Sequence, residues 1–473
     1  MVAKHIYVMN AVGQPIQAAS PQAVLLAEVA RYAVGIRLAN APAQVRAQAQ
    51  LNVLDTIGCI ASGARLPESQ DLLRAELARG GRAEATVLGT QHRLPMEAAT
   101  RVNGYMGDVF ELNDLIGGHA SITTVTPALA LAEAIGASGA QLVEAVIAGI
   151  EVVCRIHGGF YAHQKPFTET AMVQVTIASA AGSAAAASKL LGFDAQKTLH
   201  AMAIAASLTS WGPAELVFGE GNTLKPILFG GWPGSIGLLA AHYAKEGITA
   251  STRLLESPIG YYSTVARAYD ADVVLDFERW RLAQPRRKLH ACCGYTHCAI
   301  DTVANLRRAG RLRDAAKLCV HLPAYIMPAV VKHGAPPTTP NEARFNIEYC
   351  LAHAMVDTDV ILPDHSSHCL QQLERLEIKA ALAKIECVVE PRFNHYRYCR
   401  VDVLDARGAV VHSVENDAPR GSEWNPMTDD EVRNKFRRLT SHLLSATATR
   451  DYLTRFERLI DSPDCGWLLQ AFT

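Results

Sequence analysis

Apolar residues recur at helical spacing through the first half of the chain. This pattern predicts helices over 23–34 and 41–62, the second with Pro42 near its start and Gly63 just after its end. Further helices are predicted over 127–136, 141–154, 171–191 and 195–208. The segment 171–191 is rich in Ala, Ser and Gly, and small residues let helices approach closely. We therefore expect it at the centre of a helical domain.

The pattern changes after about residue 270. Strands are predicted at 316–322, 383–389, 397–404 and 409–414, the last two joined by a turn into a hairpin. Helical patterns lie between them at 299–309 and 342–355, and they return at 429–444 and 449–460. This order predicts a mainly-α fold. A large all-helical domain is built from both chain ends (1–270 and 416–473), and a smaller α+β domain (271–415) is inserted between them.

Charge and cysteine content narrow the class of protein. The chain has 473 residues and a formal net charge of −1, which argues against a nucleic-acid binder or a polybasic membrane-surface protein. Only 19% of residues are charged, which suggests surface hidden in an oligomer. The 11 cysteines follow no disulfide spacing. With no evident signal peptide or long apolar stretch, we expect reduced thiols in a cytoplasmic protein.

An acid–base cluster occurs at 111–121. Glu111, Asp114, His119 and Ser121 surround the pair Gly117-Gly118. The glycines break a helix, so we expect a loop ahead of a helix that starts near Pro127. Carboxylates and an imidazole on such a loop suit general acid–base catalysis, although an ordinary solvated turn has the same composition.

Cationic residues occur in three later segments. Lys225 precedes a glycine-rich stretch that matches no nucleotide-binding fingerprint. Between Lys288 and Asp301, histidines and cysteines gather, but adjacent Cys292 and Cys293 are poorly spaced for zinc, so we expect no metal. Thr296 and His297 are expected at a helix N-terminus, which favours an anion. Arg344 follows a proline-rich loop into a helix capped by Asn341, where it could reach a carboxylate or form a structural salt bridge.

Taken in order, these segments resemble the MmgE/PrpD family, which includes 2-methylcitrate dehydratase, cis-aconitate decarboxylase and iminodisuccinate epimerase. The resemblance extends over about 23–460 and rests on Leu54–Cys59, the loop ending Gly118-His119-Ala120-Ser121, Pro127–Leu129, Ala185–Gly192, Lys225-Pro226, Lys288, Cys292-Cys293, His297–Asp301, Pro340–Phe345, Pro426–Thr428 and Lys435-Phe436. It implies a homodimer in which the α+β domain acts as a lid. It also implies an active site in the cleft between this lid domain and the helical domain. It also implies small di- or tricarboxylate substrates and no redox or nucleotide cofactor.

The resemblance also assigns candidate residues. Asp114, His119, Lys225, Lys288 and His297 match family positions, and Glu111 stands where the family often has aspartate. We expect these six to be catalytic, and Ser121, Tyr295, Thr296 and Arg344 to contact the substrate.

Three departures separate this chain from the named members. Leu115 stands where cis-aconitate decarboxylases have threonine, and Val173, Gln174 or Val175 replaces a family histidine. Val330 and Val331 lie where those decarboxylases carry a tyrosine.

Such a site would take a proton α to a carboxylate and stabilise the resulting carbanion with cations. His119 or Asp114 could be the base. We expect a cofactor-independent lyase, similar to 2-methylcitrate dehydratase. The alternatives are an epimerase of the iminodisuccinate type, a decarboxylase of the cis-aconitate type, and a non-catalytic relative that binds an anion.

Overall fold

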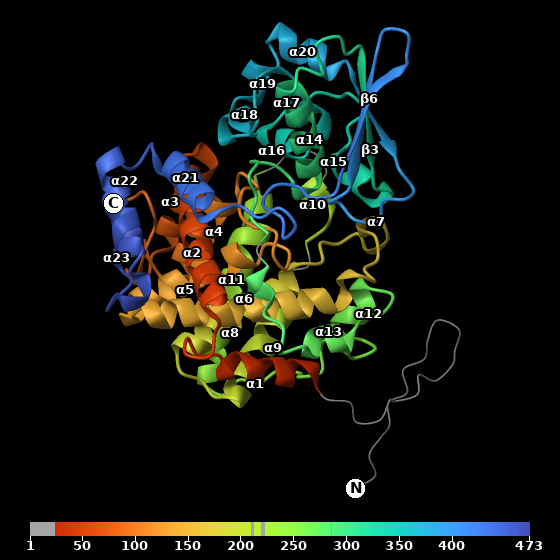
Figure 1. The fold of residues 1–473 in the computed structure, drawn as a ribbon. Coiled ribbons are helices and arrows are strands. Elements are labelled where there is room, and N and C mark those ends of the chain that lie inside the picture. Colours follow the sequence, from red (N-terminus) through yellow and green to blue (C-terminus); the bar gives the residue numbers. More distant parts are fainter. Residues whose placement is uncertain (1–23, 210–211, 219–222, 285) are drawn as a thin grey trace, which may run out of the picture.

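The computed structural model describes residues 24–473, except 210–211, 219–222 and 285 (Figure 1). Helices dominate this part of the chain, which confirms the predicted mainly-α fold. Within the same residues, none of the helices combines the length and the apolar character that a membrane crossing requires.

The helical body contains segments from both ends of the chain. Its N-terminal helices are α1 (Leu25–Gly35), α2 (Ala43–Gly63), α3 (Pro67–Arg79), α4 (Met96–Asp108), α5 (Ala120–Ile135), α6 (Gly139–Tyr161), α8 (Thr176–Leu190), α9 (Ala195–Leu208), α11 (Trp232–Lys245), α12 (Tyr261–Val265) and α13 (Ala271–Leu275). Its C-terminal helices are α21 (Asp429–Thr440), α22 (Ala446–Phe456) and α23 (Trp467–Gln470). A small hairpin of β1 (Ala85–Thr86) and β2 (Arg93–Leu94) precedes α4. In Figure 1 the blue C-terminal helices lie beside the red N-terminal ones, and α21 contacts α2.

The lid is a four-stranded sheet with helices packed on it. The strands are β3 (Lys317–Leu322), β4 (Ile385–Val389), β5 (Cys399–Leu404) and β6 (Val410–Asn416), in the order β4-β3-β5-β6. Strand β4 is parallel to β3, and the other pairs are antiparallel, with β5 and β6 forming the predicted hairpin. The helices are α14 (His297–Arg308), α15 (Met327–Val330), α16 (Pro340–Arg344), α17 (Ile347–Val356), α18 (Pro363–Ser367), α19 (Cys369–Gln372) and α20 (Leu376–Leu382).

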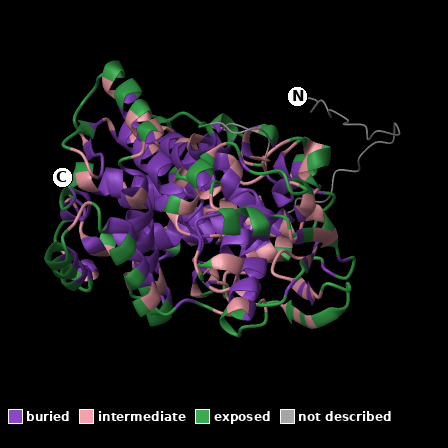
Figure 2. Ribbon diagram, turned by 90° about the horizontal axis from the view of Figure 1, so that it is seen from above, coloured by how far each residue is buried: buried purple, intermediate pink, exposed green. Residues whose placement is uncertain are grey.

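Two large hydrophobic cores hold the molecule together. The first joins the N-terminal helices to Phe436, Leu453 and Leu468 near the C-terminus. Figure 2 shows buried residues in the interior of the molecule and exposed residues at its periphery. Helix α8 contacts α5, α6, α9 and α11, and its described residues are buried apart from Lys189, so the small-residue segment does lie centrally. The second core fills the lid. It also includes Val217 from the short helix α10 (Glu215–Phe218), and the short helix α7 (Phe167–Thr170) packs against it.

Several predicted element boundaries differ from those in the structure. Helix α5 begins at Ala120 rather than near Pro127, because Gly117 and Gly118 complete the turn with positive φ and the chain can enter the helix at once. The helix predicted from 171 begins at Thr176.

The predicted 342–355 helix is interrupted. Asn346 leaves the helical conformation and its side chain accepts a hydrogen bond from Tyr349 N, so α17 starts with its own cap. Thr339 caps α16 instead of Asn341, which lies within that helix.

A buried lysine ties the C-terminal helices to the rest of the molecule. Lys435 of α21 donates to the carbonyl oxygens of Leu112 and Lys288 at 2.8 and 2.9 Å, and its Nζ lies 2.8 Å from Asp55 Oδ1. Both charged side chains are buried. This one side chain therefore connects α2, the loop after α4 and the segment that carries Lys288.

We predict that Lys435→Met lowers the free energy of unfolding by roughly 3–5 kcal/mol, because Asp55 would remain buried without its counter-charge. Urea denaturation followed by circular dichroism measures the effect. The matched control is Arg433→Met on the same helix, which breaks a partly exposed ion pair with Glu457 and should cost less than about 1 kcal/mol. Equal losses in the two variants would contradict the role given to Lys435.

Candidate active site

The candidate site lies where the helical body meets the lid. The loop between α4 and α5 supplies Glu111 and His119, Lys225 precedes a π-helical turn (Ile227–Gly231), and Lys288 leads toward α14. In this loop, Glu111 and His119 have φ angles of 54° and 76°, a region that few residues other than glycine adopt. Such strained conformations gather at functional sites, because only surrounding contacts can hold them.

Two lysines share the carboxylate of Glu111. Lys225 Nζ contacts Glu111 Oε1, and Lys288 Nζ donates to Glu111 Oε2 at 2.5 Å. Lys225 also donates to Asp108 Oδ2 at 2.6 Å. All four side chains are buried. The ammonium groups are therefore close enough to hold a single carboxylate between them.

Glycines bring Lys225 against α4. A Cβ atom on Gly104 would lie 2.2 Å from the carbonyl oxygen of Gly230, and one on Gly230 would lie 2.1 Å from that of Gly104. Only glycine allows the two backbones this approach. The glycine-rich stretch after Lys225 thus serves close packing, which places the lysine beside Asp108.

His119 completes the cluster. Its Nδ1 lies 3.3 Å from Asp108 Oδ1, and its ring stacks on Phe229 with centroids 5.2 Å apart and planes 8° from parallel. The His119 side chain retains 12% of its exposure, whereas Asp108 retains none. His119 Nδ1 makes no hydrogen bond within the described residues, but the nearby carboxylate favours a proton on that nitrogen and leaves the lone pair on Nε2.

Burial and neighbouring charges have opposite effects on the pKa values of Asp108 and Lys225. Burial alone would raise the pKa of Asp108, but Lys225 and His119 outweigh it and hold the value at about 2. Burial lowers the pKa of Lys225 to about 8, an effect that Asp108 only partly offsets. Burial also lowers the pKa of Lys288. Lys225 can therefore give up a proton near neutral pH, which an exposed lysine does not do.

Asp114 and Ser121 form a separate buried cluster. Ser121 Oγ donates to Asp114 Oδ2, and Ser121 N donates to Asp114 Oδ1 at 3.2 Å. Asn52 donates to Ser121 Oγ at 2.8 Å and accepts from Arg287. Burial raises the pKa of Asp114 to about 6, although the bonds from Ser121 oppose this. Both residues are thus engaged with each other rather than with the lysines.

Two of the predicted site residues, Thr296 and His297, lie in the segment that follows Lys288. His297 is the first residue of α14 and Thr296 is its N-cap, as predicted, and both are buried. His297 Nε2 lies 3.3 Å from the carbonyl oxygen of Cys292, and Thr296 donates to that of Cys293 at 2.8 Å. Burial lowers the pKa of His297.

Tyr295 belongs to an aromatic cluster beside these residues. Its ring lies 5.9 Å from that of Tyr325 and 5.5 Å from that of Tyr396. Next to it, Leu115 packs so tightly on Gly294 that a Cβ there would meet Leu115 Cδ1 at 2.4 Å. An apolar contact thus occupies the place where the resemblance expects a threonine hydroxyl.

Arg344 is buried at the end of α16. Its Nε donates to Ser366 Oγ at 3.1 Å, and its guanidinium lies 5.1 Å from the centre of the Phe110 ring. Its Nη2 has no hydrogen-bond partner among the described residues. Burial lowers its pKa to about 10, so it remains protonated at neutral pH and can bind an anion.

Sequence reasoning missed two residues. Asp108 comes three positions before Glu111 and so lies outside the cluster predicted over 111–121. His157 of α6 lies beside Gly118, where a Cβ would approach its Nε2 to 3.2 Å, and burial lowers its pKa to about 3. His157 is far from the 111–121 loop in sequence, so nothing in the sequence indicated that it lies beside this loop. Within the described residues it brings a second imidazole close to His119.

The cluster could also be considered as a metal site. One ligand atom each from Asp108, Glu111 and His119 lies within 4.8 Å of the others. Lys225 already places its ammonium group against both carboxylates, so a cation there would meet a positive charge. The arrangement suits an anion held by lysines better than a metal.

Comparison with known proteins identifies the family. The MmgE/PrpD N-terminal domain matches residues 27–273, and the MmgE/PrpD C-terminal domain matches residues 290–457. The chain belongs to the MmgE/PrpD family. Curated relatives include the cis-aconitate decarboxylase-like protein oryM of Aspergillus oryzae, 25% identical over an alignment of 462 residues that covers 90% of this chain and 92% of the relative. The cis-aconitate decarboxylase of Homo sapiens is 25% identical over 456 residues, covering 92% and 91%. That of Mus musculus is 24% identical over 434 residues, covering 88% and 86%.

We predict that Asp114→Asn removes one contribution to the pH dependence of stability. Because the folded state raises the pKa of Asp114 to about 6, it binds this proton more tightly than the unfolded chain. The wild type should therefore lose roughly 3 kcal/mol relative to the variant as pH rises from about 3 to 7. Urea denaturation across this range measures the difference. Exposed Asp71, changed to Asn, is the control, and a difference that does not depend on pH would contradict the assignment.

Proposed function

We propose that this protein is a cofactor-independent lyase that acts on a small di- or tricarboxylate through a carbanion next to a carboxylate. The observation that carries this proposal is the pair of buried lysines, Lys225 and Lys288, joined by one carboxylate. A substrate carboxylate next to these ammonium groups would gain strong stabilisation as it takes up negative charge, because the site excludes water. The unpartnered Nη2 of Arg344 offers a place for a second carboxylate.

We assign the general base to His119 rather than to Asp114. The contact with Asp108 orients the His119 ring, and its partial exposure leaves Nε2 able to meet a substrate. Both oxygens of Asp114 accept hydrogen bonds from Ser121, and the carboxyl group is fully enclosed. Asp114 therefore has a structural role in this proposal.

Dehydration is the reaction that uses His119, Lys225 and Lys288 together. His119 Nε2 takes the α-proton, and the electron pair of that C–H bond forms the carbon–carbon double bond. The β-carbon–oxygen bond breaks, and the leaving hydroxide receives a proton from the Lys225 ammonium, so water departs. Lys225 suits this task because its pKa of about 8 lies close to the operating pH. Lys288 stays charged and holds the substrate carboxylate.

Decarboxylation is the second candidate, and the names of the similar curated relatives favour it. In that reaction the carbon–carbon bond to a carboxylate breaks, CO2 leaves, and the carbanion takes a proton from Lys225. No base is needed to begin. Leu115 replaces the hydroxyl that those enzymes are expected to carry, which is our reason for placing dehydration first.

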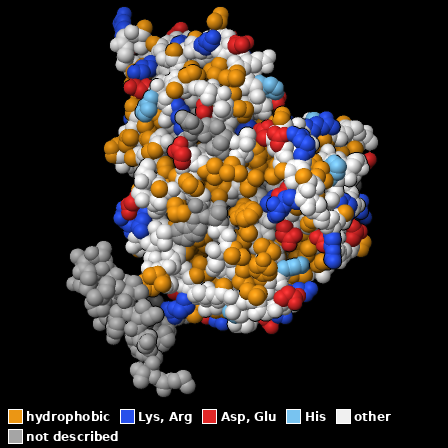
Figure 3. All heavy atoms as spheres, turned by 180° about the vertical axis from the view of Figure 1, so that it is seen from behind, with side chains coloured by type: hydrophobic (Ala, Val, Ile, Leu, Met, Phe, Trp, Pro, Cys, Tyr) orange, Lys and Arg blue, Asp and Glu red, His pale blue; other side chains and the backbone are white. Residues whose placement is uncertain are grey.

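A homodimer is part of the proposal, because the family resemblance implies one. The face in Figure 3 carries apolar side chains over much of its middle, with charged groups more frequent towards its margins. This distribution is typical of a surface that another subunit covers.

We predict that the enzyme dehydrates citrate to a product with a new vinylic proton signal, or dehydrates 2-methylcitrate so that its methyl doublet becomes a singlet on a carbon–carbon double bond. Proton NMR in D2O follows either change. Lys225→Ala should reduce the rate by at least roughly 10²-fold, because both charge stabilisation and the proton donor are lost. Lys245→Ala, on an exposed position of α11, is the matched control and should keep wild-type activity.

The same experiment separates the alternatives. Loss of CO2 from cis-aconitate would support decarboxylation, and deuterium at the α-carbon of iminodisuccinate with an intact skeleton would support epimerisation. Wild-type turnover by a folded Lys225→Ala variant would contradict the assigned site. Binding of these acids without any turnover would favour a non-catalytic relative.

We predict that kcat/KM falls as pH rises above about 8, since Lys225 must be protonated to act as the acid and loses its proton there. Initial rates between pH 6 and 10 measure the profile. In Lys225→Arg the charge remains but the proton is not released, so the rate should fall and the alkaline limb near pH 8 should disappear. A wild-type profile that stays flat to pH 10 would exclude Lys225 as the acid.

A further inference from the structure

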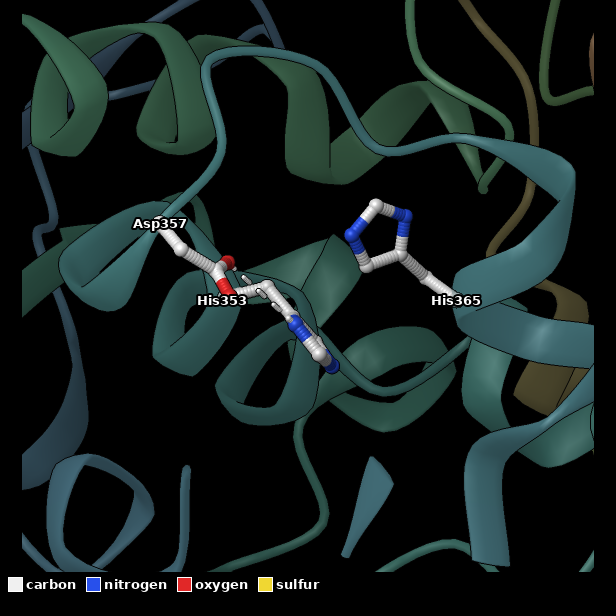
Figure 4. Close-up of side chains that lie close together, drawn as sticks. All are labelled: His353, Asp357 and His365. Carbon is white, nitrogen blue, oxygen red and sulfur yellow. Dashed lines mark ion pairs between the residues drawn. The ribbon is translucent and has the colours of Figure 1, made fainter. Parts of the chain in front are cut away.

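A second group of titratable side chains lies in the lid, outside the site described above. His353 is near the end of α17, Asp357 follows that helix, and His365 lies on α18 (Figure 4). One ligand atom from each lies within 4.8 Å of the others. In Figure 4 the two imidazoles and the carboxylate face a common space between the two helices.

His353 is the most informative of the three. Its side chain is fully buried, and neither ring nitrogen has a hydrogen-bond partner among the described residues. The ring packs edge-on against Tyr349 and His365, with centroids 4.8 and 4.6 Å away. A buried polar group without a partner costs free energy, so such an imidazole needs an explanation.

Asp357 supplies the negative charge. Its Oδ1 lies 3.9 Å from His353 Nδ1, whereas its Oδ2 accepts a hydrogen bond from Arg375 at 2.6 Å. The carboxylate keeps 37% of its exposure, so the group is open to solvent on this side. A carboxylate whose second oxygen is held in this way resembles a metal ligand with an outer-shell partner.

His365 presents its free nitrogen to the other two. The backbone N–H of Leu362 donates to His365 Nδ1 at 2.9 Å, so the neutral ring carries its proton on Nε2. A metal at Nε2 would displace that proton, and a proton taken up on Nδ1 could be donated to the carbonyl oxygen of Leu362, 3.3 Å away. The tautomer with its proton on Nδ1 leaves the lone pair on Nε2, which points away from the His365 backbone toward Asp357 and His353 in Figure 4. Neutral imidazole is the form that binds metals.

We propose that His353, Asp357 and His365 form a binding site for a divalent transition-metal ion of the zinc class. Two imidazoles and one carboxylate are a ligand set that suits Zn²⁺, with a fourth position left to water. Zinc–ligand distances of about 2.0–2.2 Å require these atoms to close in somewhat, a change within reach of side-chain rotation. Mg²⁺ and Ca²⁺ are disfavoured, because they prefer oxygen ligands.

The ion would clamp α18 to the end of α17. Ser366, next to His365, accepts the hydrogen bond from Arg344 Nε, and Tyr349 donates to the His365 carbonyl oxygen at 2.6 Å. Zinc would thus hold the segment that positions Arg344. Binding of the metal itself does not depend on the proposed function.

The test is isothermal titration of Zn²⁺ into untagged, chelator-treated full-length protein. We expect one binding event per chain. Asp357→Asn and His365→Ala should each weaken it at least tenfold, and these partly exposed positions are chosen because their variants should fold. His242→Ala, an exposed histidine on α11, is the matched control and should bind as the wild type does.

Two further measurements make the outcome decisive. His119→Ala should retain zinc affinity, and its loss would move the metal to the Asp108–Glu111–His119 cluster and overturn the proposal. Tenfold excess Mg²⁺ should not displace the zinc. No binding by the wild type, or undiminished affinity in both Asp357→Asn and His365→Ala, would also overturn it.

Discussion

The pairing of buried charges at Lys225 and Lys288 is the constraint on which the site depends. An ammonium group removed from water is tolerated only beside a counter-charge, so both lysines require Asp108 and Glu111 at contact distance. Meeting this requirement fixes the strained loop after α4 and the close approach of Gly104 to Gly230. The same pairing lowers the pKa of Asp108 and leaves Lys225 poised to exchange a proton.

The site also depends on the relative position of the helical body and the lid. Lys435, on a C-terminal helix, holds the backbone of Leu112 and Lys288 on either side of the cluster. Arg344 reaches in from the lid and lies over Phe110 of the helical body. A change in the position of the lid would therefore alter the substrate contact proposed for Arg344, while the lysine–carboxylate cluster would remain anchored to the body.

The lid group of His353, Asp357 and His365 illustrates a limit of sequence reasoning. His353 and Asp357 are four residues apart, but His365 lies eight positions further on, and a break in the helix brings it back to them. In the sequence, the Cys292-Cys293 segment is the candidate considered for a metal, because its cysteines and histidines are close together along the chain. Among the described residues, the groups able to hold a metal lie elsewhere. Adjacent residues are easily noticed, but chelation depends on distance in space.

The sequence by itself determined the mainly-α architecture, the β5–β6 hairpin and the family, because hydrophobic periodicity and ordered motifs are local properties. It also supplied Glu111, His119, Lys225 and Lys288. Only the tertiary structure decided that these four meet, that Asp114 turns instead to Ser121, and that Asp108 joins the cluster. The physical reason is that pairing of buried charges is settled by which backbones approach each other, and such contacts join residues more than a hundred positions apart.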